Sequence, residues 1–117
     1  MLAVGGHLLP GLEPQCLRMA TPLAGGLGSS HQETCGALSG GTMVIGGLLG
    51  RITADEDDEP AQALARRYRE LFFEEMGATR CEPIRNWVQG PEGPGSCSVV
   101  VERAARILLA ILEETGR

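Results

Sequence analysis

The cysteines are the residues of this sequence whose chemistry is most open to interpretation. Cys16, Cys35, Cys81 and Cys97 are separated by 19, 46 and 16 positions. A cysteine thiolate can attack a disulfide or bind a soft metal, but zinc ribbons and simple ferredoxins carry close cysteine pairs such as C-x-x-C. The spacing alone is therefore a weak metal signal. We interpret Cys16 as a small buried apolar residue, a common role of a free cysteine.

The other three cysteines are each expected near the start of a helix. Cys35 follows a predicted helix cap at Ser30, Cys81 opens the segment RCEPIRNWV, and Cys97 directly precedes the last predicted helix. Unpaired amides and the positive end of the helix dipole stabilise a thiolate at such positions, and Arg80 beside Cys81 acts in the same direction. We therefore predict redox chemistry or soft-metal ligation at these three residues, and the pattern does not choose between the two.

His31 is the imidazole nearest to a cysteine in the sequence. It stands four residues before Cys35, which is about one turn if both residues lie in one helix. In that position it would serve the Cys35 thiol as a base or as a neighbouring ligand. The alternative is an exposed histidine at a helix start.

A glycine-rich helix must position Cys35. Ser30 and Glu33 have the S-x-x-E spacing of a capping box, so we expect the helix to begin at Ser30. The glycines that follow would together cost roughly 4 to 5 kcal/mol relative to alanine, which close packing has to offset. We interpret them as packing devices in the buried centre of a bundle, with a cofactor slot as the alternative. They are Gly36, Gly40, Gly41, Gly46 and Gly47.

Apolar residues at helical spacing predict two amphipathic helices, over residues 60–76 and 98–114. Residues 12–23 are expected to form a shorter helix, residues 3–9 the end of another, and residues 80–88 one or two irregular turns around Pro83. No alternation of period two predicts a strand. The expected fold class is all-α, a compact bundle of about four principal helices with the glycine-rich helix at its centre.

Length and charge indicate a single domain over residues 1–117 and argue against nucleic acid as a partner. The net charge is −5 and the chain contains no lysine, whereas nucleic-acid affinity comes largely from basic groups. The uncharged segment 34–50 is at the short limit for a bilayer span and rich in glycine, so we expect no membrane insertion. We find no secretory signal at the start of the chain and expect a cytoplasmic location.

Three motifs, in order, resemble the C-GCAxxG-C-C family of redox-active proteins. They are the segment ETCGALSGGTMVIG with Cys35, the segment YRELFFEEMGATRCEPI with Cys81, and the segment GSCSVVVERAARILLAIL with Cys97. The resemblance extends over nearly the whole chain. The family carries a further cysteine before its first helix, and this chain starts inside what would be that helix. We therefore expect that the N-terminal part is truncated.

The resemblance implies an all-helical domain with a redox role and an unidentified redox partner protein. A similar domain in split-Soret cytochromes is associated with an iron–sulfur centre, so the resemblance implies Cys35, Cys81 and Cys97 as metal and cofactor ligands that converge at helix N-termini. Cys16, water, His31 or a second subunit would complete the ligand set, and the function would be electron transfer. Without a cluster, a metal-free thiol–disulfide protein or a structural helical oligomerisation module is the alternative. We expect a homodimer, because the truncated first helix would leave apolar surface uncovered.

Overall fold

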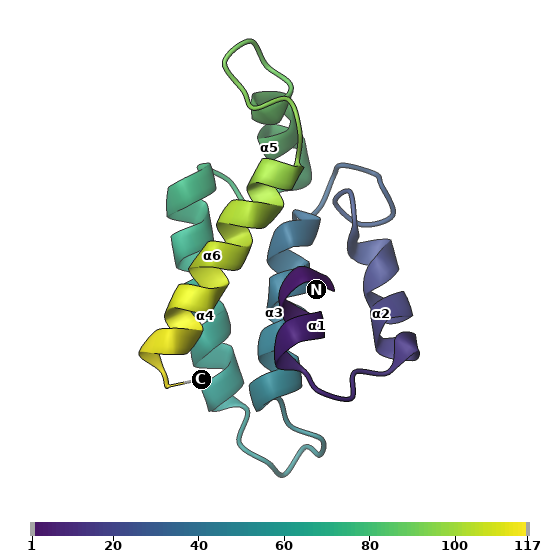
Figure 1. The fold of residues 1–117 in the computed structure, drawn as a ribbon, viewed down its shortest axis with the longest axis vertical. Helices are drawn as coiled ribbons and strands as arrows, with labels where there is room; N and C mark the ends of the chain where they lie inside the picture. The colour runs from purple at the N-terminus through teal and green to yellow at the C-terminus, as the bar shows by residue number, and fades with distance from the viewer. Residues whose placement is uncertain (1, 117) are drawn as a thin grey trace.

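The structure of the chain is a computed structural model that describes residues 2–116. Its regular elements are all helical, and the only β-type pairing among the described residues is a single bridge between Thr34 and Arg80. The elements are α1 (Leu2–Leu8), α2 (Pro14–Ala20), the 3-10 helix η1 (Thr21–Leu23), α3 (Gly36–Leu49), α4 (Glu59–Met76), α5 (Cys81–Val88) and α6 (Ser98–Glu114) (Figure 1). The all-α fold class is confirmed.

The bundle is built on the three long helices α3, α4 and α6, which pack against one another. Helix α3 also contacts α1 and η1, so the glycine-rich helix lies at the centre, as predicted. Helix α1 lies in front of α3 in the view of Figure 1, α2 lies on the side of α3 away from α4, and α5 with the loop after it extends beyond one end of the bundle (Figure 1). The most completely buried side chains are Val44, Ile45, Tyr68, Phe72, Val88, Val100, Leu108, Ile111 and Leu112.

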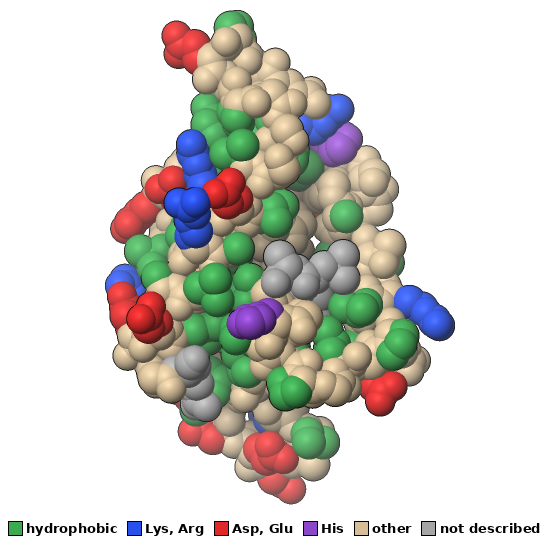
Figure 2. Space-filling view, viewed as in Figure 1, with side chains coloured by type: hydrophobic (Ala, Val, Ile, Leu, Met, Phe, Trp, Pro, Cys, Tyr) green, Lys and Arg blue, Asp and Glu red, His purple; other side chains and the backbone are tan. Residues whose placement is uncertain are grey.

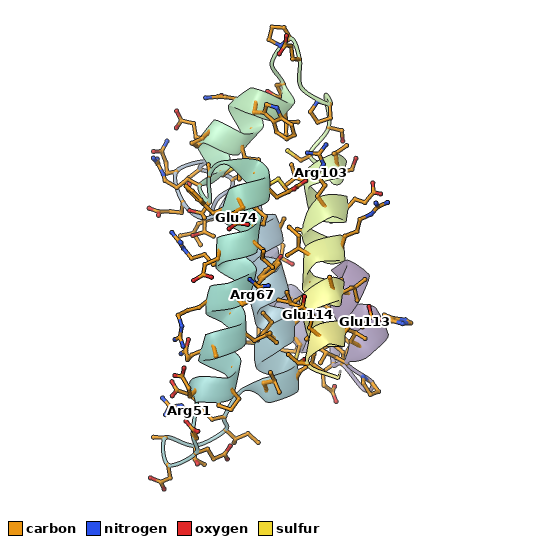
Figure 3. All side chains as sticks on the ribbon, turned by 90° about the vertical axis from the view of Figure 1, so that its left-hand side faces the viewer. Arg51, Arg67, Glu74, Arg103, Glu113 and Glu114 are labelled. Carbon is orange, nitrogen blue, oxygen red and sulfur yellow. The ribbon has the colours of Figure 1, made fainter. Side chains whose placement is uncertain are left out.

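Helices α4 and α6 run antiparallel, which brings the end of each beside the start of the other (Figure 3). Arg67 on α4 lies 4.0 Å from Glu114 on α6, and Arg103 on α6 lies 3.8 Å from Glu75 on α4. These pairs are well exposed, so each contributes little to stability. The apolar faces of the two helices therefore carry most of the packing energy.

Local sequence patterns predicted most helix boundaries correctly. Helix α6 covers residues 98–114 as expected, and α4 begins one residue before the predicted start. Gly77, with φ of 76°, ends α4 in the left-handed conformation that glycine favours. Residues 80–88 contain the short helix α5, whose Pro83 is tolerated because it lies in the first turn.

The predicted start of the glycine-rich helix at Ser30 is wrong. Helix α3 begins at Gly36, with Cys35 as its N-cap residue. The Ser30 hydroxyl donates to the Gly26 carbonyl at 2.8 Å, and the Glu33 amide donates to the same carbonyl at 3.1 Å. Both groups are thus used in a turn that precedes the helix, and the capping box does not form.

The interpretation of the α3 glycines as packing devices is confirmed at three positions. Gly41 lies directly beneath the Tyr68 phenol, Gly36 faces the backbone of Ala24, and Gly47 faces the side chain of Leu9. The Tyr68 hydroxyl donates to the Ala37 carbonyl at 3.0 Å, which fixes α4 against α3. Gly46, by contrast, faces open space. Among residues 2–116, no helix has both the length and the apolar character needed to cross a bilayer.

Candidate functional site

Three cysteines that are far apart in the sequence line one cavity of about 510 Å³. Cys35 caps α3, Cys81 is the first residue of α5, and Cys97 caps α6. The prediction that each lies at a helix start is therefore confirmed. The cysteines are free thiols; Cys35 and Cys81 are half-buried, whereas Cys97 is exposed.

A short antiparallel pairing holds the Cys35 and Cys81 helix starts side by side. The Cys35 amide donates to the Thr79 carbonyl at 2.8 Å, and the Cys81 amide donates to the Glu33 carbonyl at 2.8 Å. These two bonds flank the bridge between Thr34 and Arg80. Because backbone bonds fix both segments, the two thiols have a defined relative position in the fold.

The Arg80 side chain takes a structural role in this pairing. Its Nε donates to the Gln32 carbonyl at 3.1 Å, so the guanidinium ties the segment before α5 to the segment before α3. The charge that lowers the pKa of Cys81 belongs instead to Arg85, four residues further along α5. Spacing of four on a helix places two side chains on one face, so the sequence alone could have predicted that Arg85 lies near Cys81.

A glycine turn packs against Cys81. Residues 25–29 and His31 all have positive φ, including the non-glycine residues Leu27, Ser29 and His31. Gly26 is buried, and a Cβ atom added there would lie 2.5 Å from the Cβ of Cys81. Only glycine therefore allows the turn to approach Cys81 this closely.

The turn also places His31 beside Cys81. Nδ1 of His31 lies 3.4 Å from Sγ of Cys81, and the imidazole is half-buried. The predicted pairing of His31 with Cys35 along one helix is wrong, because α3 begins only after this turn. Sequence spacing could not show the contact, since it joins residues from two distant segments.

Burial controls the ionisation of the two inner thiols. Burial raises the pKa of the Cys35 thiol, the amides of Ala37 and Leu38 act in the opposite direction, and negative charge on Cys81 or Cys97 raises it further. Burial also raises the pKa of Cys81. Negative charge on Cys97 and on Glu82 adds to this rise, and the positive charge of Arg85 opposes it. The expectation of stabilised thiolates at these helix starts is thus wrong for Cys35 and Cys81. The apolar surroundings and the mutual repulsion of the sulfurs outweigh the amides at Cys35 and the Arg85 charge at Cys81.

The walls of the cavity are mostly aliphatic. Figure 2 shows hydrophobic side chains gathered near the middle of the face on which α1 and α6 lie. Gly36, Gly40 and Gly41 of α3 also line the cavity. Among the described lining residues, Arg85 alone has a permanently charged side chain. Aliphatic lining residues include Val4, Leu17, Leu23, Val44, Ile84, Val100 and Leu108.

The fourth cysteine does not line the cavity. Cys16 lies on α2 and is half-buried as a small apolar residue.

The described residues do not form a preassembled metal site. Within the described part of the chain, no three His, Cys, Asp or Glu side chains are close enough together to hold a metal ion. A single metal ion would require the thiols to move together. Ligation of a metal or cluster by Cys35, Cys81 and Cys97 stays a prediction.

Searches of curated proteins and of solved structures give no match. Residues 1–111, which include all four cysteines, match the model of the family described as "Putative redox-active protein (C_GCAxxG_C_C)". With a match over nearly its whole length, the chain belongs to this C_GCAxxG_C_C family of redox-active proteins.

Proposed function

We propose that the protein is a thiol–disulfide redox protein in which Cys81 and Cys97 form the disulfide and Cys35 is a third, inner thiol. The observation that carries the proposal is the convergence of all three cysteines on one cavity. Negative charge on Cys81 or Cys97 raises the pKa of Cys35, and negative charge on Cys97 raises the pKa of Cys81, so the three sulfur atoms lie within reach of one another's charge. Cys97 is exposed, so a disulfide of a partner protein can reach it.

The chemistry follows thiol–disulfide exchange. The Cys97 thiolate attacks a disulfide of the redox partner protein, which forms a mixed disulfide and releases one partner thiolate. The Cys81 thiolate then attacks Sγ of Cys97, which forms the intramolecular disulfide and releases the second partner thiolate. His31 is placed to take the proton from Cys81, and the partner thiolates take up protons from solvent. Two thiols of this chain are oxidised and one partner disulfide is reduced.

Disulfide mapping tests the proposal. The purified protein is equilibrated with glutathione buffers of defined redox potential, the remaining thiols are alkylated, and peptides are identified by mass spectrometry. We expect one disulfide, between Cys81 and Cys97, with Cys16 and Cys35 alkylated. The Cys16→Ser variant is the matched control and should form the same disulfide. Absence of a link between Cys81 and Cys97 in both proteins would contradict the proposal.

Binding of an iron–sulfur cluster for electron transfer is a second candidate. It is favoured by the placement of three thiols around one shared cavity, because thiolates are the ligands that such clusters take. Anaerobic reconstitution with iron and sulfide followed by absorption spectroscopy tests it. A cluster would give a coloured protein with stoichiometric iron in the wild type and in Cys16→Ser, but not in Cys81→Ser. A colourless wild-type protein would exclude this candidate.

The exposed apolar side chains of α6 and the free thiols support a homodimer in the cytoplasm. Val101 and Leu109 on α6 are 46% and 44% exposed, and such apolar surface supports the expected homodimer. Sedimentation that shows a monomer at all concentrations would contradict it. Free thiols in an active centre suit a reducing compartment, which supports a cytoplasmic location.

A further inference from the structure

The cavity beside the thiols has the size and lining of a small-molecule site. Its volume of about 510 Å³ lies within the range of roughly 300–1,000 Å³ that is usual for ligand pockets. Helices α1, α2, α3, α5 and α6 and the 3-10 helix supply aliphatic walls, including Leu17, Leu23, Val44 and Leu108. A ligand that fills this space must therefore be mainly apolar.

The polar groups of the cavity limit the ligand further. The Tyr68 hydroxyl already donates to the Ala37 carbonyl, so it is engaged within the protein. Arg85 is half-buried and remains as the charged donor among the described lining residues. Gly40 lines the cavity and has no side chain, so a flat group can lie against α3 there. These features favour a planar apolar ring that carries a hydrogen-bond acceptor.

We propose that the cavity binds a planar, apolar electron acceptor of the quinone class beside Cys81 and Cys97, with a carbonyl oxygen toward Arg85. The electron-transfer part of this inference rests on the proposed thiol–disulfide function; the binding part does not. A quinone accepts two electrons and two protons, which is what a pair of thiols releases when it forms a disulfide. Its ring matches the apolar walls, and its carbonyl oxygen matches the guanidinium.

The reaction balances without another reactant. The thiols of Cys81 and Cys97 lose two protons and two electrons as the bond between their sulfur atoms forms. The quinone gains the same protons and electrons and leaves as the hydroquinone. One reduced protein molecule thus converts one quinone molecule. Thiol–disulfide exchange is reversible, so a partner protein in its dithiol form then reduces the disulfide between Cys81 and Cys97 and leaves as the partner disulfide.

Binding is tested with tetramethyl-1,4-benzoquinone, whose fully substituted ring gives thiols no hydrogen to replace. The Cys81→Ser/Cys97→Ser double variant serves as the parent in calorimetric titrations, because it cannot reduce the probe. We expect saturable binding of one molecule. Ala105→Trp, which fills the cavity from α6, should weaken binding at least tenfold. Ala110→Trp, an exposed site on the same helix outside the lining, should bind as the parent does. No saturable binding, or equal binding by both tryptophan variants, would overturn the proposal.

A second pair of measurements covers the case in which Ala105→Trp does not fold. Arg85→Gln should weaken the binding of the quinone at least threefold. It should leave the binding of tetramethylbenzene unchanged, because this hydrocarbon has the same shape without carbonyl groups. Equal weakening of both probes would contradict the assigned role of Arg85. Leu17→Gln should weaken both probes, and unchanged affinity would contradict the assignment of the cavity.

Measuring quinone reduction distinguishes a failure of quinone binding from a failure of the thiol–disulfide function. Reduced wild-type protein should convert one equivalent of the quinone to hydroquinone, and the double serine variant should convert none. If the quinone binds but neither protein reduces it, the cavity assignment holds and thiol-based reduction of the quinone fails. If the disulfide between Cys81 and Cys97 forms with glutathione but no quinone binds, the proposed function holds and this inference fails.

Discussion

Nδ1 of His31 lies 3.4 Å from Sγ of Cys81, a residue 50 positions further along the chain. A histidine at this distance can accept the thiol proton or donate to the thiolate, and in either case it assists ionisation of the thiol. We expect His31→Ala to slow alkylation of Cys81 by about tenfold or more near pH 8, since a hydrogen bond to a charged group is worth about 1.5–3 kcal/mol. Peptide-resolved mass spectrometry measures the rate.

His7→Ala is the matched control for this substitution. His7 is exposed on α1 and is not among the cavity-lining residues, so its removal should leave the Cys81 rate unchanged. Equal rates for His31→Ala and the wild type would show that the contact does not assist ionisation.

The approach of the glycine turn to Cys81 gives a second test. Gly26 and Gly28 both have positive φ, 70° and 60°, but only Gly26 faces a neighbour within 4 Å. Gly28→Ala should therefore cost only the left-handed backbone strain, about 1–2 kcal/mol of unfolding free energy. Gly26→Ala should cost about 1–3 kcal/mol more, because its Cβ would meet Cys81.

Urea denaturation of the two variants measures this difference. Displacement of Cys81 by Gly26→Ala should also change the Cys81 alkylation rate, which Gly28→Ala should leave unchanged. Equal destabilisation by the two substitutions would contradict the packing described for the turn.

The ionisation of Cys35 predicts how stability depends on pH. Because burial raises the pKa of Cys35 in the folded protein, the thiol stays protonated at pH values where the unfolded chain loses this proton. The contribution of this group to stability is fully present below the unfolded pKa, near 9.0, and is lost as pH rises through the higher folded pKa. The unfolding free energy should therefore fall from about pH 9 upward, and less steeply in Cys35→Ala. Parallel profiles for the two proteins would contradict the burial of this thiol.

Local sequence patterns predicted the helices well because their determinants are local. The apolar stripes of 60–76 and 98–114, and the glycine after Met76, act within one segment and fix α4 and α6 with little influence from the rest of the chain. The positions of Cys81 and Cys97 at helix starts followed from local patterns, whereas Cys35 was expected within a helix that begins at Ser30 and is instead the N-cap residue of α3. The prediction that these cysteines converge, as they do around one cavity, came from the family resemblance rather than from their spacing.

The parts that sequence reasoning missed depend on contacts between distant segments. The spacing of Ser30 and Glu33 favours a capping box, but the turn over residues 25–31 uses both groups, and the Glu33 carbonyl accepts from Cys81. The same non-local pairing places His31 beside Cys81 instead of Cys35. The raised pKa of Cys35 follows from burial, which a list of neighbouring residues does not show.

The contact between Gly41 and Tyr68 predicts opposite effects of one substitution at two sites in α3. Gly41→Ala would press a methyl group against the buried Tyr68 ring, so we expect a loss of about 1–3 kcal/mol in unfolding free energy. Gly46→Ala meets open space in the same helix and should gain about 0.5–1 kcal/mol, because alanine restricts the unfolded chain. Urea denaturation of both variants checks the pair. Stabilisation by Gly41→Ala would contradict the described packing of α3 against α4.

The most direct test of the central claim measures whether the thiols lie close enough to act together. Phenylarsine oxide carries a trivalent arsenic that bonds to two thiols at once, so it binds paired thiols far more tightly than single ones. Cys16→Ser, which keeps Cys35, Cys81 and Cys97, should bind one equivalent as tightly as the wild type. Cys81→Ser/Cys97→Ser, which keeps Cys16 and Cys35, should bind at least tenfold more weakly. Equal affinity in these two variants would contradict the gathering of the three cysteines into one centre.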